Sequence, residues 1–191
     1  MSEAEKILRE IEESGKKSFI PVIGPVKGKI LEDTVKAHKP KIVLEIGTLI
    51  GYSAILMARL LPEGGKIISI EIDGNSAKVA QRNIEHRAGF SDKIEVMVGD
   101  AKKIIPTLKE VFDLVFIDAA KDEYLIYLKL AEEKMHRGSI VVADNAGIFA
   151  DQMADYLSYV RIGGKYVSKY HESTLEFNDS IKDGVEVSIR I

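Results

Sequence analysis

Acidic and amide side chains follow two apolar segments of this chain. The segment FDLVFID ends on Asp118, and the segment SIVVADN ends on Asp144 and Asn145. Runs rich in Val and Ile between turn residues are typical of central strands in a parallel sheet, and ligands bind outside the carboxyl ends of such strands. If the two strands are neighbours, three oxygen ligands meet at one point, a donor set for Mg²⁺, Mn²⁺ or Ca²⁺ rather than zinc. The sequence therefore predicts a metal site at these three residues, with Lys121 beside it.

Each of these residues also has a simpler interpretation. Asp118 could cap the helix that follows it, and Asp144 and Asn145 could be turn residues that bond to their own backbone. Lys121 could be a solvated lysine near a helix start, and Glu176 could be an exposed loop charge. Because suitable ligands end both strands, we favour the metal site over these alternatives.

The elements that must position these residues alternate along the chain. Apolar strand-like runs cover residues 42–46, 66–72, 94–98, 114–118 and 139–143. Helical patterns cover residues 53–61, 76–88, 102–110, 122–136 and 150–161. This alternation predicts an α/β fold with a doubly wound, mostly parallel sheet.

Both ends of the chain depart from that alternation. Helical spacing over residues 2–14 and 28–38, separated by a loop at 17–25, predicts N-terminal helices. Two strand-like runs, 165–170 and 185–191, have no helix between them and predict a C-terminal antiparallel hairpin at one edge. We expect one domain over residues 1–191, with residues 1–40 covering the cofactor and acceptor side.

Composition excludes several classes of protein. The 191 residues carry a net charge of −3 with a pI near 5.9, and no block of Lys and Arg suggests a nucleic-acid footprint. The absence of cysteine excludes disulfides, thiolate metal sites and a cysteine nucleophile. No apolar run has the roughly 18 residues of a membrane span, and the charged N-terminus has no apolar leader. We therefore expect a cytoplasmic protein with no membrane partner.

A glycine-containing turn follows the first strand. The segment EIGTLIGYS covers residues 45–53, and an acidic pair, Glu71 and Asp73, ends the second strand. Glycines at a strand-to-helix turn let the backbone approach a ligand, and an acid at the second strand end can bind ribose hydroxyls. The spacing is not the G-x-G-x-x-G that seats a pyrophosphate, which favours a nucleoside cofactor without one.

These motifs resemble those of a known family. The segments VLEIG, GYS and IEID look like the first two motifs of class I S-adenosylmethionine-dependent methyltransferases. The segments FIDAAKDEY and ADN are similar to those of cation-dependent O-methyltransferases that act on catechols and caffeoyl-coenzyme A. The resemblance runs from about Ile23 to the C-terminus. It implies a seven-stranded Rossmann-like methyltransferase sheet.

The resemblance also implies a cofactor site for S-adenosylmethionine. The resemblance implies that Glu71 binds the ribose hydroxyls of the cofactor and that Ser53 binds the carboxylate of its methionine portion. It also implies that Asp100 accepts a hydrogen bond from the adenine amine, and that Asp118 contacts the methionine amino group as well as the metal. The full set of implied cofactor-binding residues is Ile23, Glu45, Gly47, Thr48, Gly51, Ser53, Glu71, Asp100, Ala101 and Asp118.

The implied reaction is methylation of one hydroxyl of a vicinal-diol, catechol-like small molecule, with Mg²⁺ (or Mn²⁺ or Ca²⁺) chelating both oxygens. Lys121 is the implied general base, Asp118 a further member of the catalytic set, and Glu176 holds the second hydroxyl. The family also implies a homodimer with contacts on the first two helices.

One departure from the family bears on the acceptor. Ala119 and Ala120 stand where the catechol enzymes present a bulky aromatic gate, so Phe19 and Phe149 are the expected aromatics on the acceptor side. This predicts an open pocket and a larger or broader acceptor.

Three alternative functions remain open. One is a tRNA methyltransferase for 5-hydroxyuridine at the wobble position, which the acidic pI opposes but a basic patch could serve. That patch would consist of Lys16, Lys17, Lys27 and Lys29. The second alternative is a nicotinamide-dependent oxidoreductase, which the missing third glycine and the C-terminal hairpin oppose. The third is a non-catalytic binding protein, which the complete set of candidate site residues opposes.

Overall fold

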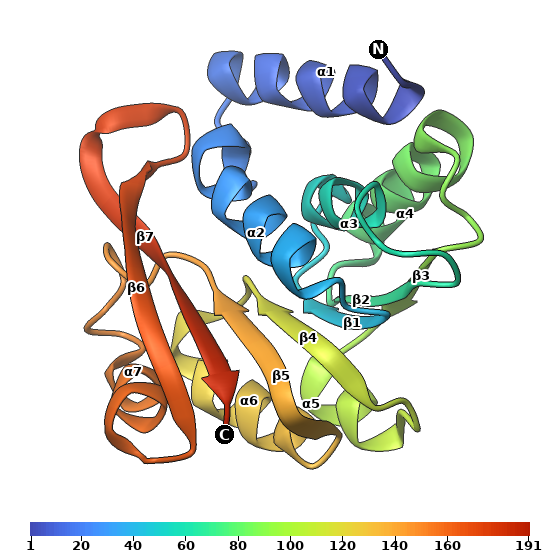
Figure 1. Cartoon of the computed structure of the whole chain (residues 1–191). Helices are drawn as coiled ribbons and strands as arrows, with labels where there is room; N and C mark the ends of the chain where they lie inside the picture. The colour runs from blue at the N-terminus through green and yellow to red at the C-terminus, as the bar shows by residue number, and fades with distance from the viewer.

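A seven-stranded sheet organises the computed structural model, which describes residues 1–191. The strand order is β3-β2-β1-β4-β5-β7-β6 (Figure 1). Strands β1 to β5 run parallel, whereas β7 is antiparallel to β5 and to β6. The strand bounds are β1 Ile42–Ile46, β2 Lys66–Glu71, β3 Ile94–Val98, β4 Phe112–Ile117, β5 Met135–Ala143, β6 Tyr166–Leu175 and β7 Asn178–Arg190.

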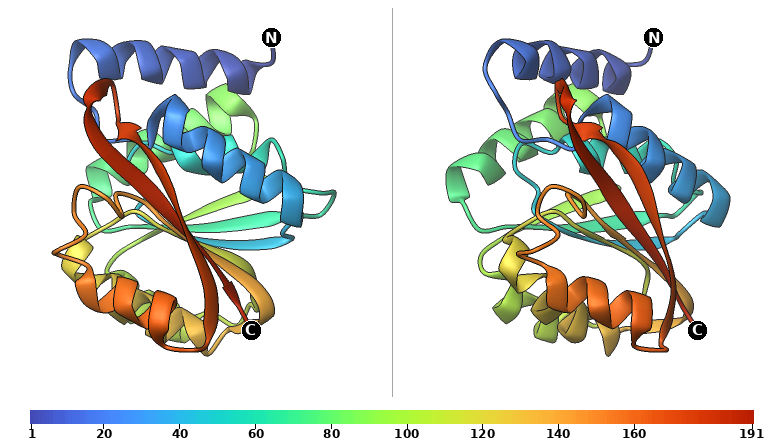
Figure 2. Two further views of the ribbon diagram at one scale, coloured as in Figure 1. Left: turned by 60° about the vertical axis from the view of Figure 1, so that its left-hand side comes forward. Right: turned by 90° about the vertical axis from the view of Figure 1, so that its left-hand side faces the viewer.

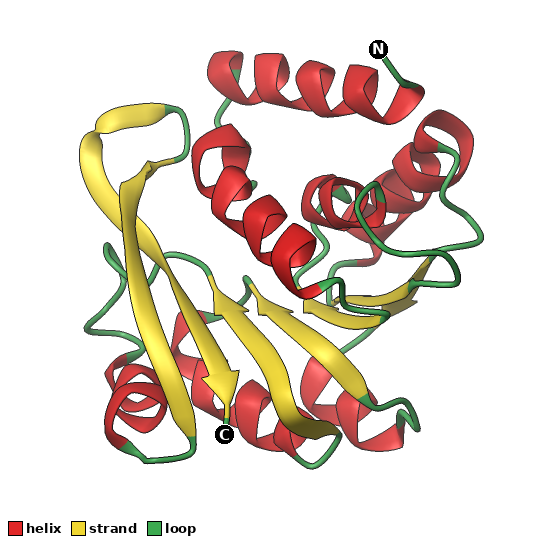
Figure 3. Ribbon diagram, viewed as in Figure 1, coloured by secondary structure: helices red, strands yellow, loops and turns green.

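Helices cover both faces of the sheet (Figures 2 and 3). Helices α1 to α4 lie on one face and α5 to α7 on the other. The α-helices are α1 Glu3–Lys17, α2 Gly24–His38, α3 Tyr52–Ala58, α4 Gly74–Arg82, α5 Ala101–Ile104, α6 Tyr124–Glu132 and α7 Ala154–Ile162. A π-helical turn, Asn83–Ala88, extends α4, and 3₁₀ turns at Ile105–Thr107 and Lys121–Glu123 flank α5 and α6. No helix is both long and apolar enough to cross a bilayer.

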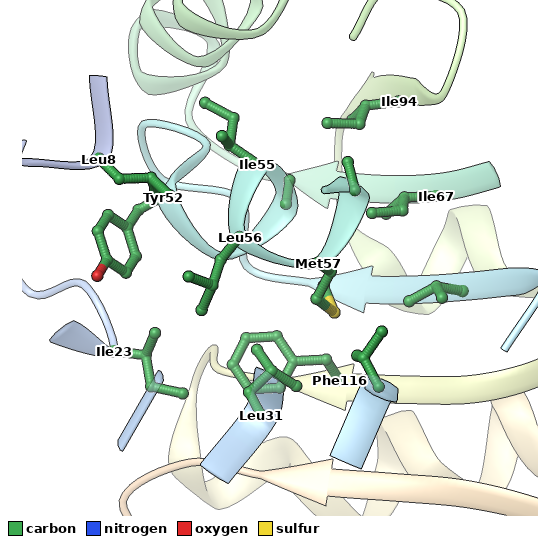
Figure 4. Close-up of a cluster of buried hydrophobic side chains, with 14 of the residues drawn as sticks. Leu8, Ile23, Leu31, Tyr52, Ile55, Leu56, Met57, Ile67, Ile94 and Phe116 are labelled. Carbon is green, nitrogen blue, oxygen red and sulfur yellow. The ribbon is translucent and has the colours of Figure 1, made fainter. Parts of the chain in front are cut away.

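Two apolar cores, one on each face, fix these layers. Figure 4 shows the first, in which Leu31 of α2 and Phe116 of β4 pack with Met57 of α3. The second lies between the other face and α5 to α7, around Phe112 and Tyr124. Alternate residues of the central strands serve opposite cores, as the pleat requires.

The predicted α/β class, the parallel sheet and the C-terminal hairpin are confirmed, and the strands at 42–46 and 94–98 have the predicted bounds. Several predicted bounds are wrong by a few residues. Helix α2 begins at Gly24 rather than at residue 28, because Pro25 occupies its first turn, where a proline needs no amide hydrogen. Helix α6 ends at Glu132 rather than at residue 136, because Met135 already pairs with Phe112 in the sheet.

The segment after β5 is not helical at residue 150, although the sequence pattern predicts a helix from there. Residues 144–153 form turns, and α7 begins only at Ala154. Asp183 of β7 explains this, because its Oδ1 accepts hydrogen bonds from the amides of Gly147 (3.2 Å) and Ile148 (3.0 Å). Strand β7 therefore holds this loop in a non-helical path after β5.

The N-terminal helices close over the carboxyl ends of the strands (Figure 1). Helix α2 packs against α3 and against the β6–β7 hairpin. Helix α1 is joined to α3 by the Tyr52 hydroxyl, which donates to Glu12 Oε1 at 2.6 Å. Its Gly15 faces the ring of Phe177 in the hairpin turn. These contacts fix the N-terminal helices against α3 and the hairpin, and the covering of the cofactor and acceptor side by residues 1–40 stays a prediction.

The turn after β1 requires glycine at one position. Gly47 has φ +100°, and a Cβ there would lie 2.0 Å from the backbone oxygen of Asp118. The turn after β1 and the end of β4 can approach each other only because this residue has no side chain.

We predict that Gly47→Ala lowers the free energy of unfolding by more than about 3 kcal/mol, since backbone strain and a backbone clash add. Gly64→Ala is the matched control: Gly64 also has a positive φ, of +72°, but a Cβ at this position would meet nothing within 4 Å. It should cost only about 1–2 kcal/mol. Urea unfolding of both variants measures the difference, and equal costs would contradict the close approach.

Candidate active site

A cavity of about 550 Å³ opens at the carboxyl ends of the parallel strands. It is the place where ligands bind in open α/β sheets. The sequence-predicted residues that line it are Ile23, Gly47, Thr48, Ser53, Glu71, Asp100, Ala101, Asp118, Lys121, Asn145 and Glu176. Glu45, Gly51 and Asp144 lie behind its wall. The structure thus brings most of the predicted set into one pocket.

Glu71 organises one end of this pocket. Its Oε2 accepts a hydrogen bond from the amide of Leu49 (2.7 Å), and its Oε1 accepts one from the amide of Asp73 (2.9 Å). The first bond holds Leu49 at φ +48°, a backbone conformation that is rare for a leucine. Each carboxylate oxygen keeps a second lone pair. Glu71 therefore holds the turn after β1 in place and can still accept hydrogen bonds from the hydroxyl groups of a ligand.

Glu45 supports the same turn from behind and is fully buried. Ser69 donates a hydrogen bond to its Oε2, and Ser69 in turn lies 2.5 Å from the Thr48 hydroxyl. Its other oxygen, Oε1, has no hydrogen-bond partner. Burial raises the pKa of Glu45 to about 7, and the negative charges of Asp118 and Glu71 add to this effect.

Two further predicted residues stand at helix starts. Ser53 lies in the first turn of α3, and Asp100 caps α5 by accepting from the amide of Lys102 at 2.9 Å. Asp100 is therefore a helix cap as well as a predicted cofactor residue. One oxygen of its carboxylate is used, and the residue still lines the pocket.

Lys121 lies at the middle of the pocket, on the 3₁₀ turn that follows β4. Its Nζ donates to Asp118 Oδ1 at 2.9 Å and to the Tyr124 hydroxyl at 2.8 Å. The Tyr124 hydroxyl lies 3.3 Å from the backbone oxygen of Asp144, to which it donates. Sequence reasoning assigned Tyr124 no role, although the spacing Lys121-x-x-Tyr124 places both on one side of a helical turn.

At the other end of the pocket, four charged side chains meet in a buried cluster. The Lys27 ammonium donates to Asp144 Oδ2 (3.0 Å), Glu176 Oε1 (2.6 Å) and Asp183 Oδ2 (2.7 Å). Lys27 is 0% exposed. Asn145 joins the cluster because its Nδ2 donates to Asp183 (2.8 Å) and to Glu176 (3.3 Å).

The predicted metal ligands are divided between two environments in this arrangement. Asp118 is paired with Lys121, whereas Asp144 and Asn145 belong to the Lys27 cluster. The acidic oxygens that approach one another within 4.8 Å are those of Asp144, Glu176 and Asp183. The assignment of Asp118, Asp144 and Asn145 as joint ligands stays a prediction.

The residues present do fit a cation. Asp144 Oδ1 is buried and accepts no hydrogen bond, although it lies 2.9 Å from the Lys27 nitrogen. Because Nδ2 of Asn145 is used within the cluster, its Oδ1 remains as a ligand atom. Three carboxylates against one ammonium leave excess negative charge in a buried place, and a divalent ion would offset it.

The pKa values in this cluster follow from burial and charge. Burial and the nearby charge of Asp118 raise the pKa of Asp144, against the opposite effect of Lys27. Burial lowers the pKa of Lys27, but the charges of Asp144 and Glu176 outweigh it and raise the net value. Burial raises the pKa of Asp183, as it does that of Asp144. The hydrogen bonds that Asp183 accepts from Lys27 and Ile148 outweigh burial and lower the pKa of Asp183 overall. Asp144 is therefore the carboxylate whose charge is least compensated.

The structure corrects the interpretation of Lys27 as part of a basic patch for tRNA with Lys16, Lys17 and Lys29. The Lys27 ammonium is buried and paired with carboxylates inside the protein, and Lys29 pairs with Asp33. The predicted patch therefore loses one of its four members to the interior. Asp183 has no place in the sequence-based set at all, because a lone acid in a strand carries no motif.

The acceptor wall is partly aromatic. Phe19 and Phe149 line the cavity as expected, together with Ala119 and Ala120. The centre of the Phe149 ring lies 5.9 Å from the Lys121 nitrogen. The expectation that Phe19 and Phe149 are the aromatics of this wall is incomplete for the cavity as a whole, since Tyr52 and Tyr127 also line it. Phe19 is 68% exposed, which leaves the mouth of the cavity open.

Comparison with known proteins agrees with this geometry. Residues 1–189 match the protein family described as O-methyltransferase. Catechol O-methyltransferase of Mus musculus is 34% identical over 174 residues, which cover 87% of this chain and 64% of that protein. The enzyme of the same name from Sus scrofa is 34% identical over 174 residues, covering 87% of this chain and 91% of that protein.

A solved structure shares the fold. The O-methyltransferase from Bacillus cereus, in complex with SAH, superposes with a TM-score of 0.85 at 24% identity and covers 99% of this chain and 90% of its own. The fold is thus that of a Rossmann-like methyltransferase. The chain belongs to the O-methyltransferase family, which confirms the family resemblance of the sequence motifs. It spans less than two thirds of the length of the mouse relative. A nicotinamide-dependent oxidoreductase does not fit this family.

We predict that Glu45 makes the ligand-free protein less stable as pH rises. Its folded-state pKa of about 7 lies above the ordinary value of 4.5, so its contribution is fully present below about pH 4.5 and is lost as pH rises to about 7. In Glu45→Gln this loss, up to about 3 kcal/mol, should disappear. Urea unfolding between pH 5 and pH 8 measures it, with the exposed Glu95→Gln as control. Parallel pH curves for the wild type and Glu45→Gln would rule out the raised pKa.

Proposed function

We propose that this chain transfers a methyl group from S-adenosylmethionine to one hydroxyl of a vicinal-diol, catechol-like small molecule, with a divalent cation, Mg²⁺ by default, bound beside the acceptor. The observation that carries the proposal is the continuity of one cavity, which runs from Glu71 past Lys121 to Asn145 and Glu176. A hydroxyl-binding carboxylate, a candidate base and a candidate cation site thus share a single space. The relatives named catechol O-methyltransferase support the same acceptor class.

The cofactor end of the cavity has the features that a nucleoside requires. Glu71 would accept the ribose hydroxyls through the lone pairs that its backbone contacts leave free. Gly47 lets the backbone approach the methionine portion, and Ser53 stands at a helix start, where a carboxylate is favoured. Ile23, Thr48 and Ala101 would supply further wall contacts.

The acceptor end has the groups that an ionising hydroxyl requires. Lys121, in its uncharged form, would accept the hydroxyl proton at Nζ, which Asp118 and Tyr124 hold in place. Glu176 would accept from the second hydroxyl, since both of its bonds within the protein use Oε1. Asp118, Asp144 and Asn145 would hold the cation.

The bound groups supply the remaining chemistry. Bound S-adenosylmethionine would supply the methyl group, with the electron pair of the broken C–S bond staying on sulfur in S-adenosylhomocysteine, and a cation held by Asp118, Asp144 and Asn145 would favour the ionised hydroxyl. The chain's own contribution is to align the oxygen with the methyl group and to keep water out.

We predict that Lys121→Met lowers kcat by about 10²–10⁴-fold, the usual effect of losing a general base. Its affinity for S-adenosylhomocysteine should stay within a factor of a few. Lys129→Met, on the exposed side of α6, is the control and should retain wild-type kcat. Steady-state assays with a catechol and calorimetric titration of S-adenosylhomocysteine give the two readouts. Wild-type kcat in Lys121→Met would remove Lys121 from the mechanism.

Chelation provides a separate test of the cation. EDTA should abolish methyl transfer to catechols, and Mg²⁺ should restore it, because the divalent ion would chelate both acceptor oxygens and favour ionisation of one hydroxyl. Full activity in EDTA would exclude a metal role. The same assay with tRNA containing 5-hydroxyuridine as acceptor separates the alternative function, which predicts transfer to tRNA and none to catechols.

The homodimer expected from the family, with contacts on α1 and α2, stays a proposal. Analytical ultracentrifugation of the full chain tests it directly, and a monomer at micromolar concentration would reject it.

A further inference from the structure

The Lys27 cluster has the geometry of a metal centre with an amino group in place of the metal. Three carboxylates from different parts of the chain converge within 2.6–3.0 Å of the Lys27 nitrogen. An ammonium group has three N–H donors, so all of them are used. The side chains of Lys27, Asp144 and Asp183 are 0% exposed.

The same three carboxylates form the one group of acidic side chains in this structure close enough to hold a metal ion. Burial of an unpaired ammonium group is unfavourable because it loses its hydration, and here three carboxylate partners offset that loss. The Lys27 ammonium group therefore occupies the place in which a metal ion would otherwise be needed to hold the three carboxylates together.

Asp144 connects this centre with the candidate cation site. Its Oδ2 accepts from Lys27, while its buried Oδ1 accepts no hydrogen bond. Asn145 is divided in the same way, with Nδ2 donating into the cluster and Oδ1 left over. Asp144 Oδ1 lies 2.9 Å from the Lys27 nitrogen without accepting a hydrogen bond from it, so it keeps its lone pairs for a second positive charge, as does Oδ1 of Asn145.

We propose that Lys27 is a built-in cation that fills the inner half of a two-cation acidic site. A divalent ion then binds only the outer half, at Asp144 and Asn145 together with Asp118. The inner half rests on the observed contacts, whereas the outer half rests on the proposed function. Lys27 is accordingly a positioning residue: it anchors Glu176 through Oε1 and neutralises Asp183, neither of which then competes for the divalent ion.

This arrangement also connects the cation site to the cofactor pocket. Lys27 lies one helical turn after Ile23, which lines the cavity, and α2 has further contacts with the hairpin that carries Asp183. Removing the amino group would leave the carboxylates to repel one another and would detach α2 from the hairpin. A metal ion in the vacated place would restore both contacts only in part, because it is not bonded to α2.

The test counts bound Mn²⁺ per full-length chain, by electron paramagnetic resonance of the free ion and by calorimetry. Lys27→Met should bind one Mn²⁺ more than the wild type, because the three carboxylates become available. The double variant Lys27→Met/Asp183→Asn should lose the additional site. Lys29→Met, two residues away on the same helix and exposed, should match the wild type.

Every outcome of this count decides the proposal. An unchanged count in folded Lys27→Met overturns it. If Lys27→Met is unfolded, saturating Mn²⁺ should restore its cooperative thermal unfolding, and failure to do so also overturns it. Because the readout is a difference, it is independent of the wild-type count. A wild type that binds no Mn²⁺ would reject the cation in the proposed function, while one additional ion in Lys27→Met would still support the built-in cation.

Discussion

A buried ammonium group that holds three carboxylates is the contact on which the acceptor side depends. Lys27 comes from α2, Asp144 follows β5, and Glu176 and Asp183 come from the hairpin. Taking one partner from such a buried group typically costs about 3–5 kcal/mol, because the remaining charges lose their compensation. The cluster therefore forms only when helix α2 and the β6–β7 hairpin are packed against each other. This packing places Asn145 and Glu176 at the pocket.

The two ends of the cavity are built by different physical means. At the cofactor end, backbone geometry dominates: Gly47 permits a close approach to Asp118, and Glu71 holds Leu49 in a rare conformation. At the acceptor end, charge compensation dominates, and burial makes each unpaired oxygen costly. Lys121 lies between them, fixed by Asp118 and Tyr124. The proposed methyl transfer would use such a division, because it needs an aligned methyl donor at one end and an acceptor oxygen that ionises at the other.

Sequence patterns predicted the sheet and the cofactor turn because these depend on local signals. The apolar runs at β1 and β3 have the predicted bounds, and Glu71 stands at the end of β2, where one of its two partners, the amide of Asp73, is close in the chain. The Lys27 cluster could not be predicted in this way. Its three carboxylates lie 117 to 156 residues from Lys27 in the chain, and Lys27 shares no short motif with any of them. By pattern alone Lys27 resembles a surface lysine, and nothing marks Asp183, although it also keeps the 144–153 loop from becoming helical.

Anomalous diffraction from crystals grown with Mn²⁺ and S-adenosylhomocysteine tests the central claim most directly. The account predicts a single manganese peak within coordination distance of Asp144 Oδ1 and Asn145 Oδ1, with the Lys27 nitrogen still bonded to Glu176 and Asp183. A manganese ion at the centre of Asp144, Glu176 and Asp183, with Lys27 displaced from the cluster, would contradict it.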